Sequence, residues 1–256
     1  FMIAYTDIGY IKRIALDTYK AQKRGGRGVN GMKQREEDFV SEMFVASSHD
    51  QILFVTNLGN MFKMKCFEIP EGSKQAKGTN LINLLNLGEG EKISAMIKIK
   101  EFNENQYLCF ATKKGVIKRS NLNLFRNVRR NAVRAINIDE DDEVRSVKLT
   151  GGNDELMIAT RNGKALHIEE NKLRPMGRTA RGVKGIRLVG DDEVDSMARI
   201  RENTTLLTIS DKGYGKRTEI SQYPIRARGG QGVFNFKCTA EKGCVCGIKT
   251  VNDDED

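Results

Sequence analysis

The sequence predicts an all-β, propeller-like fold built from five repeats of about 50 residues. One strand–turn–strand pattern recurs five times, and the glycines in its turns are spaced 50, 56, 48 and 50 residues apart. About 50 residues suffice for four short strands, which is the size of a propeller blade. No long amphipathic helical pattern competes with this prediction.

Each repeat opens with a predicted β-hairpin. The hairpin sequences are MIAYTDIGYIKR, ILFVTNLGNMFKMK, YLCFATKKGVIKRS, ELMIATRNGKALHI and TLLTISDKGYGKRT, with turn glycines Gly9, Gly59, Gly115, Gly163 and Gly213. Short hairpin turns require positive φ values, which glycine adopts without steric cost. Further strand-like runs follow, such as VRSVKL after the turn at 141–143. We expect a single domain over 1–256, with four-stranded blade units at approximately 2–51, 52–106, 107–154, 155–204 and 205–256.

Composition limits the classes of function. The chain of 256 residues has 43 Lys and Arg against 34 Asp and Glu, a net charge of +9 that permits nucleic-acid binding without showing it. No run approaches the roughly 20 apolar residues of a membrane span, and the start lacks a signal-peptide pattern. We therefore expect a soluble, intracellular protein without membrane contact.

The five cysteines do not predict a disulfide framework or a metal site. Cys66 and Cys109 lie in strand-like apolar runs and are expected in the core. Cys238, Cys244 and Cys246 form a C-x5-C-x-C pattern, which is not a common zinc spacing, and there are only two His. We expect no metal and no cofactor.

Basic residues recur at two phases of the repeat. The first phase lies about 19 residues after each turn glycine, in the segments QKRGGRG, SKQAKG, RRNAVR, GRTARG and RARGGQG. Its candidate nucleic-acid-binding residues are Gln22, Lys23, Arg24, Gly25, Gly26, Arg27, Gly28, Lys74, Lys77, Arg129, Arg130, Arg134, Arg178, Arg181, Arg226 and Arg228. The second phase lies just after the turn, at Lys12, Arg13, Lys63, Lys65, Lys118, Arg119, Lys216 and Arg217. The fourth repeat departs from it, with His167 near the equivalent place.

Acidic residues occupy a third phase, at 36–38, 89–91, 141–143, 191–193 and Glu241, which we interpret as solvated turns. Equal phase in a repeat protein means an equal place on each blade. The basic residues therefore predict a continuous positive track around a disc, separate from the acidic turns. Such a track suits a long polyanion better than a small ligand.

The heptapeptide QKRGGRG at 22–28 resembles the GyrA box in the C-terminal domain of the DNA gyrase A subunit, with Lys23 where Arg is more usual. The resemblance extends through RGVKGIRL at 181–188 and KGYGKRTEISQYP at 212–224, and covers nearly the whole chain. It implies a β-pinwheel, a propeller-like disc whose blades exchange strands and whose outer rim wraps DNA. That family commonly has a sixth blade, which is missing here or cut off, so the ring is either open or closed by five blades.

The resemblance also implies a function. The chain would bind, bend and chirally wrap duplex DNA without sequence specificity, and so supply the negative-supercoiling bias of gyrase, a type IIA topoisomerase. The cations of the box would neutralise phosphates while its glycines let backbone N–H groups approach. Implied partners are duplex DNA, the gyrase B subunit and the N-terminal cleavage–religation part of the same polypeptide, in the bacterial cytoplasm at the chromosome. The catalytic tyrosine and the ATPase site lie elsewhere, so the isolated domain is expected not to be an enzyme.

Three alternatives remain open. The related topoisomerase IV subunit often has fewer blades but lacks an intact box, so the box favours gyrase. A propeller-type protein-interaction module would present the basic track to an acidic protein surface. An RNA binder is less favoured, because few aromatic side chains accompany the basic clusters.

Overall fold

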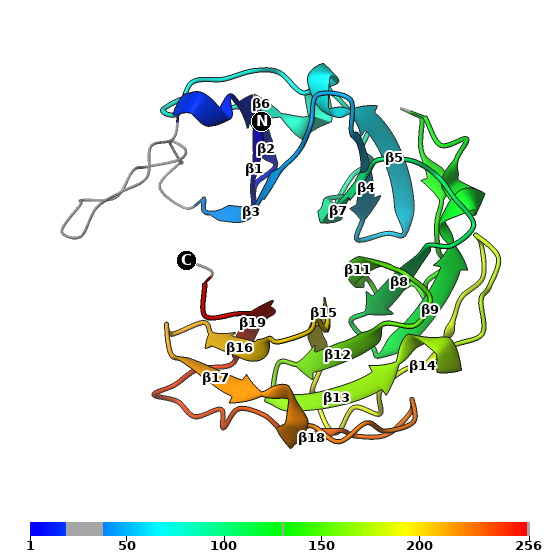
Figure 1. Cartoon of the computed structure of the whole chain (residues 1–256), viewed down its shortest axis with the longest axis vertical. Helices are drawn as coiled ribbons and strands as arrows, with labels where there is room; N and C mark the ends of the chain where they lie inside the picture. The colour runs from blue at the N-terminus through cyan, green and yellow to red at the C-terminus, as the bar shows by residue number, and fades with distance from the viewer. Residues whose placement is uncertain (19–37, 130, 255–256) are drawn as a thin grey trace.

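The computed structural model describes residues 1–18, 38–129 and 131–254. The heptapeptide at 22–28 and Arg130 therefore lie outside the described residues. Five antiparallel β-sheets stand as blades in an arc around a central space, with the first and the fifth blade at its two ends (Figure 1). This arrangement confirms the predicted all-β, propeller-like fold.

The strands are short and the blades repeat one order. The first blade contains β1 (Met2–Thr6), β2 (Tyr10–Ile14), β3 (Val40–Val45) and β6 (Thr79–Asn80). The second contains β4 (Gln51–Thr56), β5 (Asn60–Lys65), β7 (Ile93–Ile99) and β10 (Val133–Arg134). The third contains β8 (Tyr107–Thr112), β9 (Val116–Asn121), β11 (Val144–Thr150) and β14 (Val183–Lys184). The fourth contains β12 (Glu155–Thr160), β13 (Lys164–Glu169), β15 (Val194–Arg199) and β18 (Val233–Phe234), and the fifth β16 (Thr205–Ser210), β17 (Gly215–Glu219) and β19 (Val245–Val251).

Helical structure in the described part of the chain is confined to 3₁₀ turns. These are η1 (Leu16–Thr18), η2 (Cys66–Glu68), η3 (Leu81–Asn83), η4 (Leu122–Phe125), η5 (Glu170–Lys172) and η6 (Ile220–Gln222). Over those same residues, no helix has the length and apolarity to cross a bilayer.

The first four blades exchange strands along the chain. In each, the outermost strand comes from beyond the next hairpin: β6 follows β5 in sequence but pairs with β2, through Thr79 and Ile11. Likewise β18 pairs with β13, through Val233 and Ala165. This confirms the exchange that the family resemblance implies. Among the described residues the fifth blade has only three strands, so the prediction of four strands holds for the other four blades.

Within the described residues, four of the five turn glycines, all except Gly213, serve both the hairpin and this exchange. All five have positive φ, from +82° at Gly213 to +113° at Gly9, as the hairpin prediction requires. The carbonyl of Gly163 also accepts a hydrogen bond from Asn235 N at 2.8 Å. A Cβ on Gly163 would lie 1.8 Å from Phe236 O, so only glycine allows the exchanged segment to dock there.

The hydrophobic core is divided among the junctions between blades. One cluster, which includes Leu53, Val55, Phe110 and Phe125, joins the second blade to the third. Similar clusters fill the other junctions, and Cys66 and Cys109 are buried in them as predicted. Each blade therefore buries its apolar faces against its neighbours, as repeat proteins do.

The acidic turns are not simply solvated, in contrast to the sequence-based interpretation. One carboxylate in each of three turns accepts a hydrogen bond from the residue that precedes a turn glycine. The pairs are Asp38 with Ile8 N at 3.0 Å, Asp142 with Lys114 N at 2.9 Å and Asp192 with Asn162 N at 2.9 Å. These side chains hold the hairpin turn against the start of the inner strand, which is the strand nearest the central space: β3, β11 or β15 (Figure 1).

Candidate nucleic-acid interface

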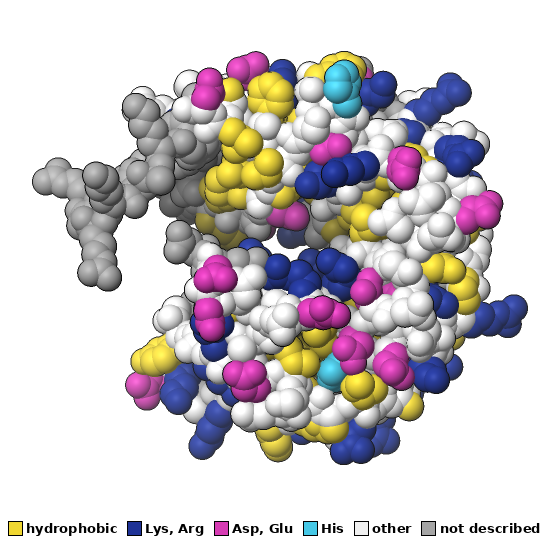
Figure 2. Space-filling view, viewed as in Figure 1, with side chains coloured by type: hydrophobic (Ala, Val, Ile, Leu, Met, Phe, Trp, Pro, Cys, Tyr) yellow, Lys and Arg dark blue, Asp and Glu magenta, His cyan; other side chains and the backbone are white. Residues whose placement is uncertain are grey.

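The first basic phase lies at the periphery of the disc. We call residues 73–78, 129–134, 177–182 and 226–232 the rim loops, because each leads into or contains the outermost strand of a blade (Figure 1). Their exposed cations are Lys77, Arg129, Arg134, Arg178, Arg181, Arg226 and Arg228, and Lys74 is half-buried. Lys and Arg side chains project from the outer edge of the molecule in Figure 2. Among the exposed rim-loop cations, Arg181 is ion-paired with Asp139.

Two rim cations are fixed by their own side chains, Arg134 within its blade and Arg228 to the neighbouring blade. Arg134 Nη1 donates to Leu58 O at 2.6 Å, and Arg228 Nη1 donates to Lys184 O at 3.1 Å. Each guanidinium still has donors left over, since it carries five N–H groups. These contacts hold the charge at the surface in a defined place.

Counting residues from the turn glycines gave the wrong equivalence for Arg134 and missed Lys184. Arg134 pairs with Asn60 as the second residue of β10, and Lys184 holds the same place in β14, opposite Val116. Arg134 is therefore equivalent to Lys184 and not to Gly182. The reason is a shorter connection: β10 begins 18 residues after Gly115, whereas β14 begins 20 residues after Gly163. Lys184 is exposed on the rim and is a further candidate for DNA contact. The alternating pattern of GVKG at 182–185 is the sequence feature that could have indicated it.

The rim-loop glycines act in strand exchange. Gly182 has φ +97°, and a Cβ there would lie 2.6 Å from Ile117 O of the preceding blade. Gly232 has φ +76°, and its Cβ would lie 2.3 Å from Ala165 O. In these copies glycine brings the outer strand onto its neighbour. An approach of the backbone to phosphate is not needed to explain them.

Two lysines of the second basic phase are buried, so the expectation that they contact DNA directly is wrong. Lys12 is 1% exposed, and its Nζ donates to Ser73 O at 2.9 Å, Lys74 O at 2.7 Å and Ala76 O at 3.0 Å. All three acceptors belong to the first rim loop. We call Lys12 and its equivalent Lys118 the clamp lysines.

Lys118 makes the same kind of contact two blades further on. It is 1% exposed, and its Nζ donates to Ala135 O and Arg178 O, both at 2.6 Å. Burial, with a smaller contribution from Arg178, lowers the pKa of Lys118 to about 7. Burial also lowers the pKa of Lys12. The clamp lysines hold rim-loop backbone and leave the rim-loop side chains to face outward.

Arg119 is also wrongly assigned to the DNA-contacting surface. It is 7% exposed, lies 4.4 Å from the centroid of the Tyr107 ring, and donates from Nη1 to Gly152 O at 3.1 Å. Its guanidinium is 3.6 Å from the buried carboxylate of Glu170. This residue anchors the turn that leads from one blade to the next.

Arg13 and Lys63 resemble Arg119 in lying against the protein. Arg13 Nε donates to Ile69 O at 3.0 Å, and its guanidinium carbon is 4.3 Å from the centroid of the Phe1 ring. Lys63 Nζ donates to Arg126 O at 2.9 Å. Both are half-buried, so they offer little free charge to a partner, whereas Lys65 is exposed.

Comparison with known proteins agrees with this geometry. A family model described as "DNA gyrase C-terminal domain, beta-propeller" matches residues 5–47, 50–100, 106–150, 154–201 and 204–237. The chain belongs to this family. The match confirms the family resemblance that the sequence motifs carry.

The most similar relatives include the DNA gyrase A subunit of Clostridium acetobutylicum, 45% identical over 255 residues. Another is the DNA gyrase A subunit of Staphylococcus aureus strain NCTC 8325, 44% identical over 258 residues. Both alignments cover 100% of this chain but only 31% and 29% of the relatives. The chain therefore spans less than a third of the length of these relatives and corresponds to their C-terminal domain.

Two solved structures share the architecture. A DNA gyrase A C-terminal domain superposes with a TM-score of 0.84 and 26% identity, over 99% of this chain and 83% of that one. A C-terminal domain of DNA topoisomerase IV gives 0.78 and 27%, over 98% and 77%. The gyrase A C-terminal domain fold is thus shared by both types of enzyme.

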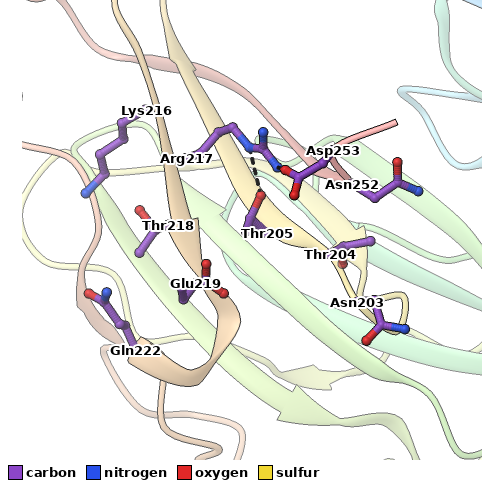
Figure 3. A pocket seen from close by; sticks show the side chains of 10 residues that line it. All are labelled: Asn203, Thr204, Thr205, Lys216, Arg217, Thr218, Glu219, Gln222, Asn252 and Asp253. Atoms are coloured by element: carbon purple, nitrogen blue, oxygen red, sulfur yellow. Dashed lines mark hydrogen bonds and ion pairs between the residues drawn. The ribbon is translucent and has the colours of Figure 1, made fainter. Parts of the chain in front are cut away.

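The fifth blade of this gyrase-type domain presents its basic residues differently. Lys216 and Arg217 are exposed and line a depression of about 690 Å³ together with Gln222 (Figure 3). Arg217 donates to Thr205 Oγ1 at 3.0 Å and to Asp253 at 2.9 Å. In the described part of the chain no outer strand covers β17.

Proposed function

We propose that this domain binds duplex DNA along its rim, bends it and wraps it chirally, without reading the bases. The observation that carries the proposal is the recurrence of exposed cations in the rim loops of successive blades, at Lys77, Arg129, Arg178 and Arg226. Cations that neutralise successive phosphates release counterions, and this supplies most sequence-independent affinity. The relatives named as gyrase A subunits support duplex DNA as the polyanion.

Wrapping requires several blades to act together. Bending 20–30 base pairs by 40–90° costs on the order of 1–6 kcal/mol. An exposed ion pair contributes about 0–1 kcal/mol, so the one or two exposed cations of a single rim loop cannot offset most of this range. The clamp lysines fix two of the rim loops to adjacent blades, so their cations keep a constant spacing. Gln22–Gly28, with Lys23, Arg24 and Arg27, would secure one end of the DNA arc.

In the whole protein the wrap would bias strand passage toward negative supercoiling. The domain would work with the gyrase B subunit and with the N-terminal cleavage–religation part of its own polypeptide, in the bacterial cytoplasm. The domain itself would contribute no catalytic residue. The likeness to a topoisomerase IV domain supports one alternative, DNA binding in that type of enzyme.

A topology assay tests the proposal. Nicked circular DNA is ligated with increasing amounts of the chain, the protein is removed, and the change in linking number is scored. A shift that grows with protein is expected, and the double variant Arg178→Ala/Arg226→Ala should reduce it. The matched control is Lys100→Ala/Lys249→Ala, which removes two exposed cations at inner strands. Binding without any shift would refute wrapping, and equal losses in both variants would refute the role of the rim.

A further inference from the structure

Two cysteines lie at the base of one short loop at the junction of the fourth and fifth blades. Cys238 lies between β18 and β19, and Cys244 directly precedes β19. Between them Thr239 and Gly243 form an antiparallel bridge, with Gly243 N donating to Thr239 O at 2.8 Å. Gly243 has φ +78°, which permits the tight turn. The bridge places residues 238 and 244 opposite each other at the base of the loop, where side chains of paired strands are adjacent.

The surroundings of the side chains agree with this placement. Cys238 Sγ donates to Arg161 O at 3.3 Å, and burial, together with the neighbouring Cys244, raises the pKa of the Cys238 thiol. Val245 N donates to Arg161 O at 2.9 Å, so Arg161 lies beside the Cys244 backbone, and Cys244 raises the pKa of the Arg161 guanidinium. Both cysteines are free and half-buried, so a small reagent can reach them.

Cys246 has a different environment although it is close in sequence. It is exposed, and burial together with Asp195 and Asp211 raises the pKa of its thiol. Over the described ranges, no three Cys, His, Asp or Glu side chains gather as metal ligands. The arrangement is therefore a pair of thiols beside a cation.

We propose that Cys238 and Cys244 form a reversible dithiol–disulfide site, for which a low-molecular-weight disulfide such as glutathione disulfide is the oxidant. Cys244 is the attacking group, because the positive charge of the neighbouring Arg161 attracts the anionic sulfur that carries out the attack. Its sulfur displaces one glutathione thiolate and forms a mixed disulfide. The Cys238 sulfur then attacks the Cys244 sulfur, releases the second glutathione and leaves the Cys238–Cys244 bond. Two thiols lose their protons and are oxidised, and one glutathione disulfide is reduced to two glutathiones.

The bond would link the segment after β18 to the start of β19. β18 is the outer strand of the fourth blade and β19 the inner strand of the fifth. The oxidised chain should unfold at a higher temperature than the reduced chain, because the cross-link restricts the unfolded state.

Peptide mass spectrometry after incubation with glutathione disulfide and alkylation of the remaining thiols tests this site. The expected product is an intramolecular Cys238–Cys244 disulfide that dithiothreitol reverses. Cys246→Ser should still form it, Cys238→Ser should stop at a glutathione adduct on Cys244, and Cys244→Ser should form no intramolecular bond. Arg161→Gln should slow formation, while the melting temperature of the reduced variant checks that it is folded.

Three results would overturn the proposal. One is a disulfide that involves Cys246. Another is glutathione addition at both cysteines without a bond between them. The third is equal reaction rates for the Arg161→Gln variant and the unchanged chain, since the guanidinium would then not activate Cys244.

Discussion

The third and fifth blades carry the same basic pair after their hairpin turns, yet the pair has opposite surroundings. Lys118 and Arg119 are buried in the third blade, whereas Lys216 and Arg217 are exposed in the fifth. The difference is the outer strand. β14 pairs with β9 in the third blade, and within the described residues no outer strand pairs with β17.

The turn glycines show the same contrast. A Cβ on Gly115 would lie 2.6 Å from Ile186 O, and one on Gly213 would meet no atom within 4 Å. The repeat that follows a blade therefore determines whether a basic residue of that blade holds the fold together or faces a partner. The blade's own sequence does not decide it.

The largest expected effect is on stability, from removing the ammonium group of Lys118. Lys118→Met keeps an apolar stem but leaves Ala135 O and Arg178 O without their donor. Unpaired buried acceptors cost about 1–3 kcal/mol each, so we expect the two of them to lower the free energy of unfolding, measured by urea denaturation, by about 2–6 kcal/mol. Lys216→Met, the matched control, should change stability by less than about 0.5 kcal/mol. Equal losses of stability in both variants would contradict the contrast between a buried Lys118 and an exposed Lys216.

A second test uses the two glycines. Gly115→Ala must accommodate both a positive φ and the approach to Ile186 O, whereas Gly213→Ala meets only the unfavourable φ. We expect about 1 kcal/mol for Gly213→Ala and at least about 3 kcal/mol for Gly115→Ala, measured by thermal or chemical unfolding. A larger loss at Gly213 would mean that the outer edge of the fifth blade is covered in solution.

A third test follows from the pKa of about 7 for Lys118 against the ordinary 10.5. Between these values the unfolded chain binds a proton that the folded chain does not, so this group makes stability rise with pH. Its contribution is at most about 1.4 kcal/mol per pH unit. Denaturation of the unchanged chain and of Lys118→Met from pH 7 to 9 should therefore diverge, with the steeper rise in the unchanged chain. Parallel profiles would contradict a lowered pKa.

The smallest expected effect concerns Lys184, on the rim, and Arg119, which is anchored. Lys184→Ala should reduce the slope of log affinity for duplex DNA against log salt by about 0.9, the value for one phosphate contact. Arg119→Ala should leave that slope unchanged even if affinity falls, because its guanidinium faces Gly152 and Glu170. A reduced slope for Arg119→Ala would place it at the DNA.

The sequence was sufficient wherever the structure is local. The hairpins and the positive φ of Gly9 or Gly213 follow from turn chemistry within a few residues. The burial of Lys118 could not be predicted this way, because its acceptor Arg178 O lies 60 residues away on an exchanged strand segment. Rim cations such as Arg178 were found by phase alone. The position counted from the turn glycine gave the wrong equivalence for Arg134. The connection from Gly115 to β10 is two residues shorter than the connection from Gly163 to β14.

The salt dependence of duplex DNA affinity tests the central claim most directly. The chain would be compared with Arg178→Ala/Arg226→Ala/Arg228→Ala, which removes exposed rim cations, and with Lys118→Met, which removes a buried one. We predict that the slope of log affinity against log salt falls by about 0.9 for each phosphate that the rim variant no longer neutralises, and stays unchanged in Lys118→Met. An unchanged slope in the rim variant would contradict the assignment of the rim as the DNA-binding surface.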